Sequence, residues 1–482
     1  MEKQPEKAPL AEADDAPPER GREFEAELGL ESKGEQVEVK AASVAEANIA
    51  VTDLPSAAAA PVSGEGAEFA SAATLANRPE ADASALNSQM AVRCSQVLLF
   101  LAGVWWAYGP AQERLDQAQV PGFLIALAIS WTLTPEIAKR AIKLDLVDRP
   151  GEARRIHTTP IPRLGGVGVY ITVLATVTML IAIAGRLPKD ARGAEGIIGI
   201  AVGGTLVFVL GLIDDLDSIK AKVKLVIQVL AGCTAYSLGV RIKTIPLPAH
   251  MNIDLGPLHL HGQIELGMLG LPLTVLWLVG VANAVNLIDG MDGLAAGVSA
   301  ISALTIWSVA LGSDISRPYA ALMAAVLAGA LLGFLRWNFN PARIFLGDSG
   351  AYLTGFILAA ISITGVIKGV TAGTVIVPTI LLVGLILFFP LLDTSWAIVR
   401  RAVKGKNIFS PDRLHIHHRL LDQGFDQKKV AYIIYGISAA LGLIATCFVH
   451  QEIYFLKVVA GVLLLAWFFA EVLNRHRQKG RK

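Results

Sequence analysis

Long apolar runs constrain this chain more than any other feature of its sequence. Runs of roughly 15–22 residues recur from about residue 91 onward, and each is about as long as a helix needs to cross roughly 30 Å of hydrocarbon. They are apolar all round, whereas the helices of a soluble enzyme keep a polar stripe. Charged residues make up only 17% of the chain, against roughly 25% in soluble domains. The sequence therefore predicts an all-α polytopic membrane protein.

The apolar segments predict about 11–12 transmembrane helices. They lie near residues 95–109, 121–141, 165–185, 196–213, 222–239, 269–287, 294–311, 318–337, 348–366, 372–395, 430–448 and 453–472. The first is short and ends in Trp105, Trp106 and Tyr108, and aromatic residues of this kind concentrate at membrane interfaces.

The chain divides by composition into four parts. We predict a disordered tail at residues 1–90, an extra apolar segment and linker at 91–120, a transmembrane domain at 121–472 and a basic tail at 473–482. The first part carries about 18 acidic and 7 basic side chains and few aromatic ones, so it cannot bury enough apolar surface to offset the entropy of ordering. It also lacks the basic and apolar regions of a cleavable signal peptide.

Basic residues predict the orientation in the membrane. About 25 Lys and Arg residues fall in the connections on one side, including the loops after residues 139, 220 and 400 and the C-terminal tail. Cytoplasmic connections are enriched in these residues, so we expect this side to face the cytoplasm, with both termini inside if all twelve segments span. On the other side, Ile253–Ile264 alternates roughly in polarity, as a small hairpin or an interfacial element would.

Three acidic clusters fall on the predicted cytoplasmic side. Asp214-Asp215 ends one apolar run, Asn283–Leu294 follows another, and Asp348 stands between two glycines where a third begins. Adjacent carboxylates close to hydrocarbon repel one another unless a cation or a shared proton compensates them. Hard oxygen ligands of this kind favour Mg²⁺, which takes one or two carboxylates and leaves positions for water and phosphates. Solvated or capping helix ends are the alternative interpretation for each cluster taken alone.

Two basic clusters accompany the acidic ones on this side. The first contains His157 and Arg163 in a proline-rich loop that ends in two glycines, and the second contains Arg413 and three histidines, His415, His417 and His418. Guanidinium groups bind anions, and imidazole groups can bind anions or transfer protons. We therefore expect both loops to contact a phosphate-bearing partner. Positive-inside enrichment explains the arginines of the first loop about equally well, and a zinc site is the alternative for the histidines of the second, although the Mg²⁺-type carboxylates elsewhere favour phosphate contact.

Together, five motifs resemble the polyprenyl-phosphate N-acetylhexosamine-1-phosphate transferases. In order they are the Asp148-to-Gly166 loop, Asp214-Asp215, Asn283–Leu294, Phe345–Gly350 and His415-Ile-His-His. The resemblance covers roughly residues 121–472. In this chain an isoleucine, Ile416, interrupts the histidines. This motif resembles that of the branch that makes lipid-linked GlcNAc, whereas the phospho-MurNAc-pentapeptide branch tends to have three consecutive histidines.

The resemblance implies transfer of a sugar-1-phosphate, most simply GlcNAc-1-phosphate, from a UDP-sugar to undecaprenyl phosphate in the bacterial inner membrane. The expected cofactor is Mg²⁺, with Mn²⁺ as a substitute. The expected partners are the UDP-sugar, the lipid phosphate and the bilayer, with no nucleic acid and with a homodimer as one oligomeric option.

Roles for the individual residues follow from the same hypothesis. Asp215 and Asp348 would hold the metal, and Asp214 would bind or deprotonate the lipid phosphate. The catalytic set is Asp214, Asp215, Asp289 and Asp292, and the substrate-binding set is Asn286, Asp289, Asp292, Arg413, His415, His417, His418, Arg163 and His157. Direct attack by the lipid phosphate and a covalent aspartyl intermediate both stay open.

Two alternatives differ in activity. The phospho-MurNAc-pentapeptide transferases share the chemistry and differ in the sugar substrate. A secondary transporter would also contain intramembrane carboxylates, but it would hold them nearer the bilayer midplane, often within inverted repeats, and neither feature is evident in this sequence.

Overall fold

The computed structural model describes most of the chain from residue 78 to residue 449. The described residues are 78–108, 117–148, 160–184, 194–246, 252–254, 259–261, 263–312, 317–367, 379–405 and 415–449. The chain divides into Met1–Ala76 and Asn77–Lys482, and every element below belongs to the second unit.

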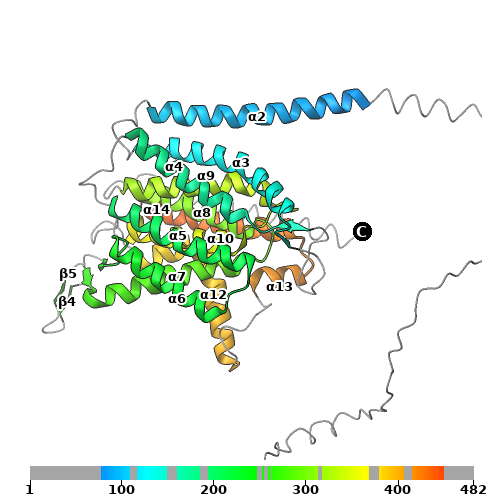
Figure 1. The fold of residues 1–482 in the computed structure, drawn as a ribbon. Helices are drawn as coiled ribbons and strands as arrows, with labels where there is room; N and C mark the ends of the chain where they lie inside the picture. The colour runs from blue at the N-terminus through cyan, green and yellow to red at the C-terminus, as the bar shows by residue number, and fades with distance from the viewer. Residues whose placement is uncertain are drawn as a thin grey trace, which may run out of the picture. The chain divides into compact units, whose positions relative to one another are not determined.

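Helices account for most of the described residues (Figure 1). In chain order they are α2 Arg78–Tyr108, α3 Gln119–Lys143, α4 Gly165–Ala184, α5 Ala194–Leu216, α6 Ala221–Ser237, η2 Gly267–Leu269, α7 Gly270–Ile288, α8 Leu294–Ala310, α9 Pro318–Asn338, α10 Gly347–Ile361, the π-helical η3 Ser362–Ile367, α11 Thr379–Ile386, α12 Phe388–Val403, α13 Ile416–Asp422 and α14 Gln427–Val449.

Eight of the described helical stretches are long and apolar enough to cross a membrane. They are Ala91–Tyr108, Gln119–Lys143, Gly165–Ala184, Gly196–Leu216, Gly267–Ile288, Pro318–Asn338, Gly347–Ile367 and Gln427–Val449. The all-α polytopic prediction is therefore confirmed.

The remaining predicted segments have other outcomes. Helices α6 and α8 are both 17 residues long. The predicted segment 372–395 contains α11 and the first half of α12, which are separated by Leu387. The predicted segment 453–472 lies outside the described residues. Helix α2 begins at Arg78, inside the predicted disordered tail, and its membrane-length apolar part is Ala91–Tyr108, close to the predicted segment 95–109.

The centre of the bundle is formed by α9 and α10. In their most apolar windows 83% and 94% of the residues are buried, against 17% in α2. Helix α9 packs against α3 and α8, and α10 packs against α5 and α7. The small residues of α9, such as Gly329 and Gly333, allow this approach, because a Cβ at either would collide with the α3 backbone.

Three small antiparallel pairs lie outside the bundle. The strands are β1 Val147–Asp148, β2 Ile161–Pro162, β3 Thr244–Pro246, β4 Asn252–Asp254, β5 His259–His261 and β6 Gln263–Glu265. They pair as β1–β2, β3–β6 and β4–β5. The β4–β5 pair, with Ile253 opposite Leu260, confirms the small hairpin predicted in this region. Pair β1–β2 lies next to the polar helix ends described below, since Pro162 accepts a hydrogen bond from the Phe345 N–H.

Candidate active site

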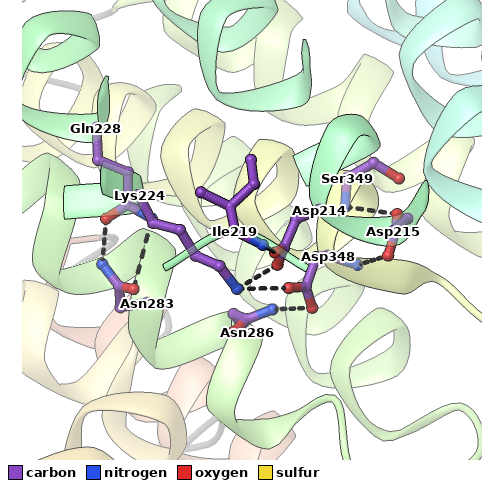
Figure 2. Close-up of polar contacts among 9 residues, drawn as sticks. All are labelled: Asp214, Asp215, Ile219, Lys224, Gln228, Asn283, Asn286, Asp348 and Ser349. Carbon is purple, nitrogen blue, oxygen red and sulfur yellow. Dashed lines mark hydrogen bonds and ion pairs between the residues drawn. The ribbon is translucent and has the colours of Figure 1, made fainter. Parts of the chain in front are cut away.

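Asp215, at the end of α5, holds the first turn of α10 in place. Its two carboxylate oxygens accept hydrogen bonds from the backbone N–H groups of Asp348 at 2.7 Å and Ser349 at 3.0 Å (Figure 2). The first N–H groups of a helix have no partner within the helix and favour a negative charge. Asp215 therefore fixes where Asp348 lies.

Lys224 lies between two of the acidic side chains. Its ammonium group forms a close ion pair with Asp214 and approaches the Asp348 carboxylate at 3.5 Å (Figure 2). Asp214 also accepts a hydrogen bond from the Ile219 N–H at 2.8 Å. The Asp214 side chain is only 4% exposed, whereas that of Asp348 is 35% exposed. The buried Asp214 therefore holds the Lys224 ammonium group in place, while the Asp348 carboxylate remains accessible.

Helix α7 contributes two carboxamides to the same region. The Asn286 amide donates to Asp348 at 2.8 Å, and the Asn283 amide donates to the buried Gln228 side chain of α6 at 2.6 Å (Figure 2). Since a buried polar group needs a partner, the second pair fixes α6 against α7. This also fixes Lys224, which lies one turn before Gln228 on α6.

Asp289 follows the last residue of α7 and is half-buried. Within the described part of the chain, its carboxylate accepts no hydrogen bond. Burial, followed by the negative charges of Asp348 and Asp215, raises the pKa of the Asp289 carboxyl well above its usual value. A proton or a bound cation would relieve this repulsion.

Two glycines allow these segments to approach each other closely. Gly347 has φ +74°, a left-handed conformation that disfavours other residues. A Cβ there would collide with the Arg163 carbonyl and would lie 2.7 Å from an Asp215 oxygen. A Cβ on Gly166 would collide with the Gly350 N–H. Of the paired glycines noted in the sequence, Gly166 is thus the contact point between α4 and α10.

Asp292 has a different environment from the other acids. Its Oδ2 accepts hydrogen bonds from the Asn340 amide at 2.9 Å and from the Ala342 N–H at 3.0 Å. The Tyr435 hydroxyl donates to the Gly293 carbonyl at 2.5 Å. Asp292 thus connects the start of α8 to the loop between α9 and α10.

The histidines form a cluster at the start of α13. The His415 Nδ1 lies 2.7 Å from an oxygen of Asp393 on α12. The rings of His415 and His417 are 5.8 Å apart and nearly parallel, and those of His417 and His418 are 4.3 Å apart. His417 is 1% exposed, and its Nε2 would lie 2.8 Å from a Cβ placed on Gly290. The cluster therefore adjoins the turn after Asp289.

His417 is kept neutral by its surroundings. Burial, together with the neighbouring His418 ring, lowers the pKa of His417 to about 4. Neither ring nitrogen of His417 has a hydrogen-bond partner within the described part of the chain. A neutral imidazole offers one donor and one acceptor, so His417 is suited to a polar ligand group rather than to holding a phosphate by charge.

The cluster formed by Asp214, Asp215, Asn286, Asp289 and Asp348 is called the acidic centre below. A polar pocket of about 340 Å³ opens beside it. Arg163 and Asp148, both on its lining, form an ion pair. Asp215 and Leu216 line its other side. The Arg163 guanidinium is therefore close to the acids but is already paired with a carboxylate.

The acidic centre can be compared with the needs of a divalent cation. Among the residues that the structure describes, no three His, Cys, Asp or Glu side chains are grouped so as to hold a metal alone. Mg²⁺ usually takes only one or two carboxylates and completes its shell with water and substrate phosphates. Asp348 is accessible and Asp289 has no hydrogen bond from the described residues. These two hard oxygen ligands fit Mg²⁺ in the presence of a phosphate substrate.

Most of the predicted site residues come together. Asp214, Asp215, Asn286, Asp289 and Asp348 form one acidic centre, and His415 and His417 adjoin it. His157 and Arg413 lie outside the described residues. Sequence reasoning missed Lys224 and Asp393. Lys224 falls in a basic connection, where positive-inside enrichment alone accounts for it. Asp393 stands in an apolar run where a charge is costly without a partner, a signal that could have identified it.

Known proteins resemble this chain over the region that contains the acidic centre. The model of Glycosyl transferase family 4 matches residues 197–366, which include all three acidic clusters. The chain is 35% identical to the "Probable undecaprenyl-phosphate N-acetylglucosaminyl 1-phosphate transferase" of Bacillus subtilis over 73% of this chain and 91% of that protein. It is 37% identical to the "Decaprenyl-phosphate N-acetylglucosaminephosphotransferase" of Mycobacterium leprae, over 68% and 84%.

A more distant relative covers a similar share of the chain. The "Undecaprenyl-phosphate alpha-N-acetylglucosaminyl 1-phosphate transferase" of Thermotoga maritima is 28% identical over 72% of this chain and 96% of that protein. The chain therefore belongs to the polyprenyl-phosphate N-acetylhexosamine-1-phosphate transferases of Glycosyl transferase family 4, and it is an integral-membrane phosphotransferase.

Proposed function

We propose that the protein transfers GlcNAc-1-phosphate from UDP-GlcNAc to undecaprenyl phosphate and releases UMP. The observation that carries this proposal is the acidic centre, in which four carboxylates and Lys224 meet at the ends of α5, α7 and α10. The relatives of Bacillus subtilis and Thermotoga maritima are named for undecaprenyl phosphate and N-acetylglucosamine, which supports this substrate pair over the pentapeptide alternative.

The reaction forms one bond and breaks one bond at a single phosphorus atom. A phosphate oxygen of the lipid attacks the phosphorus next to the sugar. The bond from that phosphorus to the bridging oxygen breaks, and its electron pair leaves with UMP. Several negative charges meet in this step, so fixed positive groups aimed at the phosphates lower the barrier. Lys224 supplies one, held by Asp214 and aimed toward Asp348.

We infer that Asp348 and Asp289 hold Mg²⁺ and that Asp215 acts by positioning Asp348. Both Asp215 oxygens already accept hydrogen bonds from α10, so Asp215 suits the metal less well than its sequence motif predicts. A Mg²⁺ ion held there would supply positive charge to the diphosphate and to the departing UMP. Asn286 keeps the Asp348 carboxylate oriented through its 2.8 Å hydrogen bond.

Direct attack fits these environments better than an aspartyl intermediate. Asp214 and Asp215 are held by an ion pair and by backbone N–H groups, respectively, and a lipid phosphate is already largely ionised near neutral pH. A covalent route would exchange labelled UMP into UDP-GlcNAc without any lipid phosphate. We expect no such exchange.

The site would face the cytoplasm from the inner membrane. Lys222, in the first turn of α6, and Arg343, in the loop before α10, lie at the same end of the bundle as the acidic centre, and cytoplasmic connections are enriched in such residues. UDP-sugars are made in the cytoplasm, so this orientation would give the site its soluble substrate.

The test is a transfer assay with the full chain in lipid nanodiscs. Undecaprenyl phosphate, Mg²⁺ and radiolabelled UDP-GlcNAc should give label in the lipid extract, EDTA should remove it, and added Mg²⁺ should restore it. Parallel reactions take UDP-GalNAc and UDP-MurNAc-pentapeptide. Label from the pentapeptide alone would overturn the sugar assignment, and no label from any donor with folded protein would overturn the proposed function.

A further inference from the structure

Asp393, which no sequence motif includes, connects α12 to the histidine cluster. It stands in the second turn of α12 and is only 2% exposed. Its neighbours on the outer face of α12, Leu392 and Trp396, are 40% and 52% exposed. A carboxylate turned away from this apolar face and buried inside the protein is costly unless it is fully paired.

Both oxygens of Asp393 are used at the start of α13. Oδ1 accepts the Ile416 N–H at 2.8 Å, and Oδ2 lies 2.7 Å from the His415 Nδ1. A carboxylate oxygen accepts but does not donate, so the proton in the second contact belongs to Nδ1. Asp393 therefore determines both the direction of the chain entering α13 and the tautomer of the first histidine.

This effect reaches the active site through stacked rings. His415 lies nearly parallel to His417, with 12° between the ring planes. His417 in turn lies against Gly290, the residue after Asp289. When His415 is neutral, a proton on Nδ1 leaves Nε2 as a hydrogen-bond acceptor.

We propose that Asp393 is a positioning residue that holds His415 with its proton on Nδ1 and sets the geometry of the histidine cluster beside the acidic centre. It acts through His415 and does not touch the substrate. Only the kinetic part of its test rests on the proposed function, because the proton position on His415 can be measured without turnover.

The tautomer is tested by ¹⁵N NMR of histidine-labelled protein in nanodiscs, with the His415 signals assigned by their loss in His415→Asn. In the wild type we expect a protonated Nδ1. In Asp393→Asn the amide oxygen can still accept the Ile416 N–H, but the NH₂ group now points at Nδ1 and moves the proton to Nε2. The control, Asp422→Asn, changes an exposed acid of α13 and should leave the signals unchanged. A proton on Nε2 in the wild type would overturn the proposal.

A double-mutant cycle tests the route of the effect. His415→Asn keeps an N–H that can reach Asp393 but removes the ring. We expect Asp393→Asn alone to lower kcat/KM at least about tenfold, and to change it less than about twofold when His415→Asn is already present. Independent, multiplicative losses would show that Asp393 acts by another route and would overturn the proposal. If no variant and no wild type transfers sugar phosphate, the NMR result still decides the positioning role.

Discussion

At the residue scale, the acidic centre is defined by an imbalance of charge. Asp214, Asp215, Asp289 and Asp348 influence one another electrostatically, and Lys224 compensates two of them. Burial, together with the repulsion that remains, raises the pKa of the Asp289 carboxyl well above its usual value. A site with surplus negative charge can bind an anionic diphosphate only together with added cations, which is why metal dependence and Lys224 belong to the same explanation.

Lys224→Met should lower transfer by about 10²–10³-fold, because it removes a positioned charge from the reacting phosphates. The matched control is Lys222→Met, which removes an exposed lysine from the same helix and should keep near-normal activity. Both variants are compared by their initial rates of transfer to lipid phosphate in nanodiscs. Thermal unfolding checks that each variant is folded. Equal activity of the two variants would contradict the role of Lys224.

Because of His417, the folded protein should lose stability relative to the unfolded state as the pH falls into the mildly acidic range. An unfolded histidine takes up a proton below about pH 6.5, whereas folded His417 stays neutral down to about pH 4. The unfolded state therefore binds more protons between these values, so stability falls as the pH falls, by about 2 kcal/mol from pH 8 to pH 5 for this group. Melting temperatures across this range should fall less in His417→Gln than in the wild type, and parallel curves would contradict the prediction.

At the scale of elements, the site depends on how closely α10 approaches its neighbours. The first turn of α10 lies against the Arg163 carbonyl, the Asp215 carboxylate and Gly166. Glycine is needed where no Cβ fits, so the Gly-Gly and Gly-Asp-Ser-Gly motifs are primarily packing requirements that bring Asp348 to Asp215. The catalytic geometry thus follows from backbone contact between helices.

Gly347→Ala should therefore impair both folding and transfer. Its Cβ would meet the Asp215 carboxylate from a backbone at φ +74°, at a cost of about 1–3 kcal/mol. We expect a lower melting temperature and at least about tenfold lower transfer, since a small displacement of a catalytic group is costly. Gly280→Ala is the control, because a Cβ there meets nothing within 4 Å. Normal melting and activity of Gly347→Ala would show that α10 tolerates the displacement.

At the scale of the whole molecule, the site lies at one end of the bundle. The acidic ends of α5 and α7 meet the start of α10 there. The short helix η2 lies at the opposite end of α7 and forms the beginning of the same membrane-length stretch. Met268 in η2 is 96% exposed. The two ends of α7 therefore offer a direct test of orientation.

Single cysteines at Lys222 and Met268 should label from opposite sides. In a background without the three native cysteines, a membrane-impermeant maleimide should reach Met268→Cys in intact spheroplasts and Lys222→Cys only in inverted vesicles. The reverse pattern would place the acidic centre outside the cytoplasm and would contradict the proposed source of UDP-sugar.

The sequence by itself determined the fold class and most members of the site. Hydrophobic length alone identifies a membrane helix, because the bilayer sets that length, and the ordered motifs predicted that Asp214, Asp215, Asn286, Asp289 and Asp348 belong together. Only the tertiary structure decided what each one does. It showed that Asp215 binds the N-terminus of α10 and that the buried Asp214 pairs with Lys224. It also showed that Asp393 contacts His415, 22 residues further along the chain. These roles depend on contacts between residues distant in sequence, and no local pattern of residues determines such contacts.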